Sequence, residues 1–67
     1  MLEMVREYFE AGYEIMVDFY GYYDPCADWQ DVLDSFAEVE EDEYMHWRGY
    51  EVDHAAREFW LFQGSDD

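Results

Sequence analysis

The residues of this chain that are best equipped for chemistry are its carboxylates. The 67 residues include 19 Asp and Glu but only three Arg and no Lys, which gives a formal net charge of −16. Nine of these acids lie between positions 24 and 43, a stretch without any basic residue: Asp24, Asp28, Asp31, Asp34, Glu38, Glu40, Glu41, Asp42 and Glu43. A surface this acidic attracts basic surfaces and repels nucleic acid and anionic membranes. We expect these nine residues to form a partner-binding site.

Two Glu-x-x-His motifs suggest a different use of acids, which is metal binding. Paired motifs of this kind on two helices are typical of di-iron proteins, which also need a glutamate from each of two further helices. Here Glu43–His46 and Glu51–His54 begin only eight residues apart, with Gly49 between them. The acids at 40–43 also lack the alternating ligands and central glycine of a calcium loop. We therefore expect no metal and no cofactor, and we expect both histidines to pack or to lie at the surface.

Catalysis is not indicated by the sequence. Cys26 has no catalytic signature around it, no Gly-rich phosphate loop is present, and the acids are too many and too uniform to single out a general acid and a general base. A single cysteine excludes an internal disulfide and favours a reducing compartment. The sequence shows no signal peptide and no apolar run of membrane-spanning length. We expect a cytoplasmic protein that is not an enzyme.

The acids between positions 24 and 43 need an element that positions them, and the apolar residues among them predict a helix. These residues recur at i, i+3, i+4, i+7 and i+8, the spacing of one buried helix face: Trp29, Val32, Leu33, Phe36 and Ala37. Asp24-Pro25 has the form of an N-cap followed by proline at the first helical position. We expect the helix to run from about Pro25 to Val39 or a little beyond, with Asp31, Asp34 and Glu38 facing water.

Carboxylates on such a helix repeat at a spacing comparable with that of DNA phosphates. Acids three or four positions apart lie roughly 5–6 Å apart along a helix axis, and duplex DNA carries one charge per ~3.4 Å of each strand. The row consists of Asp31, Asp34 and Glu38, then Glu41 or Asp42, and Asp24 and Asp28 extend it. An ordinary solvated helix face has the same spacing. The total charge and the absence of lysine favour a functional row.

The first segment, residues 2–20, also has helical spacing, carried by Val5, Tyr8, Phe9, Gly12, Tyr13, Met16, Phe19 and Tyr20. A strand is the alternative, because Tyr13, Ile15, Val17 and Phe19 alternate with other residues and 10–12 can form a hairpin turn. The longer window favours the helix, with Gly21 as its C-cap.

The remainder of the chain is expected to hold one short irregular stretch and one helix. Residues 44–50 form the irregular stretch. Residues 51–62 form the helix, with Val52, Ala55, Ala56 and Phe59 at helical spacing, Gly64 after its end and an acidic tail at 65–67. The whole chain, 1–67, is then one small, mainly α domain of three to four helices. The alternative is an α+β domain with an N-terminal β-hairpin.

Three sequence features occur in a distinctive order. FYGYYDP at Phe19–Pro25 precedes the acidic stretch DWQDVLDSFAEVEEDE, and GYEVDHAAREFWLFQGSDD at Gly49–Asp67 follows it. This order resembles a module of the ArdA-type antirestriction proteins, and the resemblance covers about two-thirds of the chain. In that family an aromatic-Gly-aromatic turn precedes an acidic helix, and an Ala-Arg-acid-aromatic run and a Gly-Asp end follow. Ala56–Phe59 and Gly64–Asp66 occupy the corresponding places.

The resemblance implies an acidic mimic of B-form DNA that occupies the DNA site of a restriction enzyme. This chain has one module rather than several and lacks the longer Leu/Glu-rich antirestriction motif. A short phage-type anti-CRISPR inhibitor therefore fits its size better. We expect it to act in the bacterial cytoplasm, where it would block the DNA-entry or PAM-reading surface of a CRISPR effector by competing with duplex DNA. The alternatives are an inhibitor of a restriction enzyme and an acidic regulatory domain that docks on another basic protein.

Overall fold

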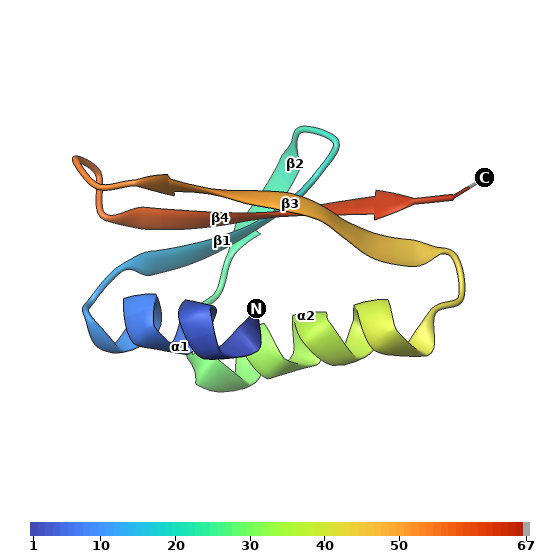
Figure 1. Ribbon diagram of the computed structural model, residues 1–67, viewed down its shortest axis with the longest axis horizontal. Helices are drawn as coiled ribbons and strands as arrows, with labels where there is room; N and C mark the ends of the chain where they lie inside the picture. The colour runs from blue at the N-terminus through green and yellow to red at the C-terminus, as the bar shows by residue number, and fades with distance from the viewer. Residues whose placement is uncertain (67) are drawn as a thin grey trace.

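The computed structural model describes residues 1–66 and contains two helices and four strands. Their order is α1 (Leu2–Glu10), β1 (Glu14–Phe19), β2 (Tyr22–Pro25), α2 (Trp29–Glu41), β3 (Met45–Asp53) and β4 (Glu58–Ser65). The strands form one mixed sheet in the order β2-β1-β4-β3, in which β1 and β4 run parallel and the two outer pairs are antiparallel. Both helices lie against the same face of the sheet (Figure 1).

The expected mainly α bundle is wrong, because the chain forms a small α+β domain. The alternative fold class, α+β, is the one observed, but its hairpin lies elsewhere than expected. Residues 10–12 end α1, and the N-terminal hairpin joins β1 to β2 through Tyr20 and Gly21.

The first segment is half helix and half strand because Gly12 ends the helix. Gly12 has a φ of 91°, a left-handed conformation that favours glycine. The Tyr13 amide donates to the Tyr8 carbonyl at 3.0 Å and the Gly12 amide donates to the Phe9 carbonyl at 3.1 Å. These two bonds are the Schellman motif that closes a helix C-terminus. Beyond it, the alternation of Ile15 and Val17 takes over and forms β1.

Gly21 is a hairpin glycine rather than the expected helix C-cap. Tyr20 and Gly21 both have positive φ, 49° and 92°, as a two-residue hairpin turn of type I′ requires. Asp18 supports the turn, because its Oδ1 accepts a hydrogen bond from the Gly21 amide at 3.0 Å. The turn therefore folds β2 back onto β1, with Phe19 opposite Tyr22.

The central helix exists, but it begins later than expected. Its N-cap is Asp28, whose Oδ1 accepts from the Asp31 amide at 3.0 Å. Asp24 and Pro25 instead end β2, an edge strand in which proline is tolerated. The predicted apolar face is only partly right, because Val32 is buried, Trp29, Leu33 and Phe36 are half-buried and Ala37 is exposed.

The C-terminal half is a β-hairpin, so the irregular stretch at 44–50 and the helix at 51–62 are both wrong. β3 and β4 pair along their length, with a bulge between Trp47 and Gly49. The Ala-rich turn between them is held by Asp53, whose Oδ1 accepts from the Ala56 amide at 3.0 Å. Gly64 lies inside β4 rather than after a helix, and Asp66 donates to the Tyr44 carbonyl. Of the predicted acidic tail, Asp67 lies outside the described residues.

The hydrophobic core lies between the sheet and the helices. Its fully buried side chains are Val5 from α1, Ile15 from β1, Val32 from α2, and Phe59 and Leu61 from β4. β4 contributes two of the five because it is an inner strand with neighbours on both sides. Neither helix in residues 1–66 is long and apolar enough to cross a membrane.

Candidate functional site

All nine acids predicted to bind a partner are exposed in the structure. Four of them converge from two elements on one hollow of about 430 Å³ between α2 and the β1–β2 hairpin. Asp24 comes from β2, and Asp31, Asp34 and Glu38 come from α2. We call this hollow the acidic groove. It is also lined by Val17, Phe19, Tyr22, Pro25, Cys26, Ser35 and Gln63.

The other five predicted acids do not line the groove. Asp28 caps α2 at its N-terminal end. Glu40 and Glu41 lie in the last turn of α2, and Asp42 and Glu43 follow directly. Asp42 is engaged locally, because its Oδ1 accepts from the Tyr44 amide at 2.8 Å. These acids extend the charge of the helix beyond the groove.

Within residues 1–66, no arginine forms an ion pair with an α2 acid. The arginine ion pair there is Arg6–Glu10, at 2.6 Å, and His46 lies 3.6 Å from Asp66, a contact that is ionic only when the histidine is protonated. Arg48 lies over the Tyr20 ring, and Arg57 lies over the Tyr13 ring. The negative charge of α2 is therefore not balanced by the protein's own cations.

Cys26 reports the electrostatic field inside the groove. Burial and then the negative charge of Asp31 raise the pKa of the Cys26 thiol from 9.0 to about 11, with smaller contributions from Asp28 and Asp24, against the lowering effect of a hydrogen bond to Ser35. Burial, the largest cause, disfavours a charge of either sign, whereas the contributions of Asp31, Asp28 and Asp24 disfavour an anion and favour a cation. The carboxylates around Cys26 therefore attract positive charge.

The carboxylates of the groove keep free acceptor capacity. One oxygen of Asp31 accepts from the Ala27 amide, and one oxygen of Asp34 accepts from the Gln30 side chain, both at 2.9 Å. Each carboxylate retains a second oxygen. In the described part of the chain, no hydrogen bond to the carboxylates of Asp24 or Glu38 is formed. A bound donor would find several oxygens without displacing an internal bond.

Gln63 is a groove residue that sequence reasoning missed. It lies in β4, pairs with Phe19 on one side and Trp47 on the other, and is 7% exposed. No hydrogen bond of its side-chain amide is formed within residues 1–66, and the amide is not fully enclosed. The available signal was the single amide that directly follows the apolar run Phe59–Phe62, one residue beyond the predicted helix at 51–62.

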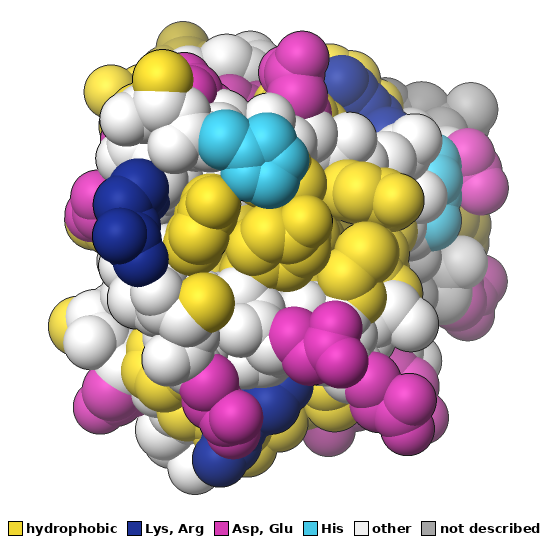
Figure 2. Space-filling model, turned by 60° about the vertical axis from the view of Figure 1, so that its left-hand side comes forward, with side chains coloured by type: hydrophobic (Ala, Val, Ile, Leu, Met, Phe, Trp, Pro, Cys, Tyr) yellow, Lys and Arg dark blue, Asp and Glu magenta, His cyan; other side chains and the backbone are white. Residues whose placement is uncertain are grey.

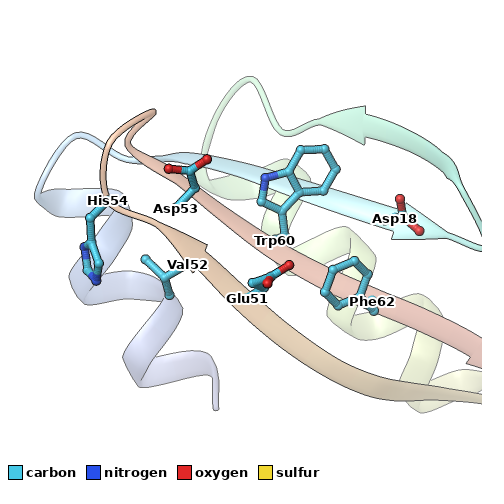
Figure 3. Close-up of a pocket in the computed structure, with 7 residues that line it drawn as sticks. All are labelled: Asp18, Glu51, Val52, Asp53, His54, Trp60 and Phe62. Carbon is cyan, nitrogen blue, oxygen red and sulfur yellow. The ribbon is translucent and has the colours of Figure 1, made fainter.

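The opposite face of the sheet carries a second acidic hollow, of about 450 Å³ (Figure 3). Trp60 and Phe62 of β4 line it together with Asp18 of β1 and Glu51 and Asp53 of β3. The Tyr23 ring packs edge-on against Trp60 with 5.0 Å between centroids. These acids were not among the predicted site residues, because the predicted helix at 51–62 separated them from Asp18.

Neither histidine approaches a set of metal ligands. His54 shares a hydrogen bond of 2.9 Å with the Tyr13 hydroxyl, and His46 lies opposite Gly64 in the β3–β4 ladder. Among residues 1–66, no three His, Cys, Asp or Glu side chains gather as a metal site would require.

Figure 2 shows a hydrophobic area on one face of the molecule, with histidine, arginine and acidic side chains at its margin.

Comparisons with protein-family models, with curated proteins and with solved structures give no match.

Proposed function

We propose that this protein is a DNA mimic that inhibits a bacterial CRISPR effector by occupying its Lys/Arg-lined DNA-entry or PAM-reading surface. The proposal rests on one observation above all, which is that the carboxylates of α2 and the acidic groove are exposed and not balanced by arginine. The mechanism is competition with duplex DNA, and it needs no bond to be made or broken.

The charge density of the molecule supports mimicry of DNA. The net charge of −16 along a longest dimension of 35 Å corresponds to one charge per roughly 2.2 Å, against ~1.7 Å for duplex DNA. The same 35 Å equals about one helical turn of B-DNA. The molecule therefore fits a compact DNA-reading surface better than the long groove of a restriction enzyme, which remains the alternative target.

The rigidity of the charged element is a second support. A mimic must hold its charges in place, because ordering them at the interface would cost conformational entropy. α2 is capped by Asp28 and packs against the sheet through Val32, which is fully buried. Its outward carboxylates are thus displayed on a fixed scaffold.

Competition with DNA tests the function directly. Tagged protein is used to capture partners from a bacterial lysate that contains a CRISPR effector, with and without excess duplex DNA. The DNA mimic is expected to capture the effector in the absence of added DNA and to lose it when DNA is in excess. A ternary complex that retains DNA would exclude mimicry. Capture of another basic protein that DNA does not displace would instead support the regulatory docking domain.

A further inference from the structure

We propose that the acidic groove binds one arginine side chain of the partner, and that the side-chain carbonyl of Gln63 accepts a hydrogen bond from its guanidinium group. This inference rests on the proposed function and deepens it. A DNA-reading surface is rich in arginine, and the groove would accept one of those arginines as a whole side chain rather than as a diffuse charge.

Gln63 supplies the observation that points to a ligand. Side chains of β4 alternate between the two faces of the sheet, and Phe59 and Leu61, which share the face of Gln63, are fully buried. Gln63 is more than nine-tenths buried and makes no hydrogen bond within the described residues. Its amide is not among the fully enclosed unpaired groups there, so the small exposed part of the side chain opens onto the groove that it lines. The groove is the space that it lines, so a donor that enters the groove can satisfy its carbonyl oxygen.

The carboxylates at the groove supply the charge that an arginine needs. Guanidinium binds carboxylates through paired N–H···O bonds of fixed geometry. The groove has carboxylates from two elements, because Asp24 lies on β2 and Asp31, Asp34 and Glu38 lie on α2. Each of these side chains has at least one oxygen free to accept. After burial, the charges of Asp31, Asp28 and Asp24 also contribute to the raised pKa of Cys26 in the same groove, which agrees with a negative field there.

The apolar lining favours arginine over lysine. A planar guanidinium stacks on aromatic rings and is weakly hydrated, whereas an ammonium is a compact, strongly hydrated point charge. Every arginine of this chain lies over an aromatic ring: Arg6 over Trp29 at 4.7 Å, Arg48 over Tyr20 at 4.6 Å and Arg57 over Tyr13 at 5.4 Å. Tyr22 lines the groove, is 82% exposed and carries no such arginine.

The hollow on the opposite face lacks this combination. It has aromatic side chains and acids, but its lining residues in the described part of the chain include no buried polar side chain. Acids outside the groove therefore provide a matched control. The comparison separates a built site from general attraction between a cation and a highly acidic protein.

The test is a titration of ¹⁵N-labelled protein with three short peptides, acetyl-Gly-X-Gly-amide, in which X is arginine, lysine or citrulline. Citrulline keeps the shape of arginine and removes its charge. We expect the arginine peptide to produce a saturable shift of the Gln63 side-chain NH₂ resonances and the Cys26 amide, the lysine peptide to bind several-fold more weakly and the citrulline peptide to leave these resonances unmoved.

Two pairs of substitutions locate the site. D31N/E38Q removes two groove charges and is expected to weaken arginine binding at least about tenfold. E7Q/E14Q removes two charges away from the groove and is expected to change it less than about twofold. Q63M is expected to abolish the preference for arginine over lysine. If Q63M does not fold, the comparison of D31N/E38Q with E7Q/E14Q still decides whether the groove binds arginine.

Several results would overturn the assignment. They are equal binding of lysine and arginine, equal weakening by both charge pairs, or the absence of a saturable Gln63 shift up to ~10 mM peptide. The peptide titration contains no CRISPR effector, so its failure is distinguishable from failure of the proposed function. If DNA displaces the partner but the groove does not bind the arginine peptide, the proposed DNA mimicry stands and only the proposed arginine site is excluded.

Discussion

Cys26 is the residue at which the acidity of the groove can be measured without knowing the partner. Its thiol has a pKa of about 11 rather than 9.0 because of burial and the nearby charge of Asp31. A thiolate, not a thiol, reacts with alkylating agents. At pH 8 the thiolate fraction of Cys26 is therefore about a hundredfold below that of an unperturbed cysteine.

We predict slow alkylation of Cys26 by iodoacetamide at pH 8 in the folded protein and fast alkylation in denaturant. Asp31→Asn should accelerate the reaction in the folded state, because it removes the largest of the three charge effects on the thiol. Glu7→Gln, which lies on α1, is the control and should leave the rate unchanged. Mass spectrometry of timed samples gives the rates. Folded wild type that reacts as fast as denatured protein would contradict the raised pKa of the Cys26 thiol.

The same pKa has a consequence for stability at high pH. The folded-state pKa lies above the unfolded value, so the folded state prefers the protonated thiol, and this contribution is complete below pH 9 and is lost as pH rises through 11. The tyrosines also ionise near pH 10, so the contribution is isolated by comparing wild type with Cys26→Ser. The difference between their unfolding free energies should shrink from pH 9 to pH 11.

Phe59 and Trp29 differ in burial, and their truncations should differ accordingly. Phe59 is fully buried and packs against Tyr8 and Tyr50, whereas Trp29 is half-buried against Phe9 and Arg6. Truncation of a fully buried aromatic residue costs about 3–5 kcal/mol, and a chain of this length has only about 3–10 kcal/mol of stability. Phe59→Ala should be unfolded at room temperature, and Trp29→Ala should still melt cooperatively. Circular dichroism melts that show the reverse order would place the core elsewhere.

At the scale of elements, α2 carries the proposed interface and can be tested as a unit. The variant D31N/D34N/E38Q/E41Q/D42N keeps side-chain shape and removes five charges. Reduced self-repulsion should leave its stability unchanged or slightly higher, while its inhibition of the effector should weaken. The matched control E3Q/E7Q/E10Q/E14Q/E51Q removes the same number of charges elsewhere and should inhibit nearly as well as wild type.

Equal inhibition by both quintuple variants would move the interface away from α2. Single substitutions on α2 should have small effects, except where a carboxylate meets a buried arginine, because removing one partner of such a pair can cost 2–5 kcal/mol. Asp31 and Glu38 are therefore expected to matter more than Glu41, which does not line the groove.

The existence of the acidic helix could be predicted from the sequence because its signal is local. Val32 is buried and the acids around it are exposed, as the helical spacing requires. The start of the helix was wrong by a few residues, because Asp24-Pro25 and Asp28 both have cap chemistry and only the pairing of β2 with β1 excludes the former. A competing strand partner cannot be seen in the local pattern.

The second half of the chain was not predictable in the same way. The run Phe59–Phe62 is apolar on both faces, which is typical of an inner strand but gives no clear alternation. Ala55 and Ala56 are strong helix formers, yet they lie in the β3–β4 turn. This error hid the groove, because Gln63 lines it together with α2 only when β4 lies in the sheet beside β1.

At the scale of the whole molecule, salt should act on folding and on binding with opposite signs. Charges on the surface are screened beyond ~8–10 Å at physiological ionic strength. Screening relieves the self-repulsion of 16 net negative charges and weakens attraction to a basic partner. We predict that raising NaCl increases the melting temperature while it steeply lowers affinity for the target. The lowering of affinity is followed by fluorescence anisotropy, and salt-independent binding would contradict an electrostatic interface.

The place of β4 in the sheet also fixes when the protein can fold. β4 is the last of the six elements along the chain, yet it is an inner strand and supplies Phe59 and Leu61 to the core. On the ribosome, α1, β1, β2 and α2 must emerge without the strand that joins them to β3. Contacts between β1 and β4 span more than 40 residues, and such distant pairing slows folding. We therefore expect the nascent segment to stay unfolded until β4 has emerged, and we expect its like charges to help keep it from collapsing or associating during that interval.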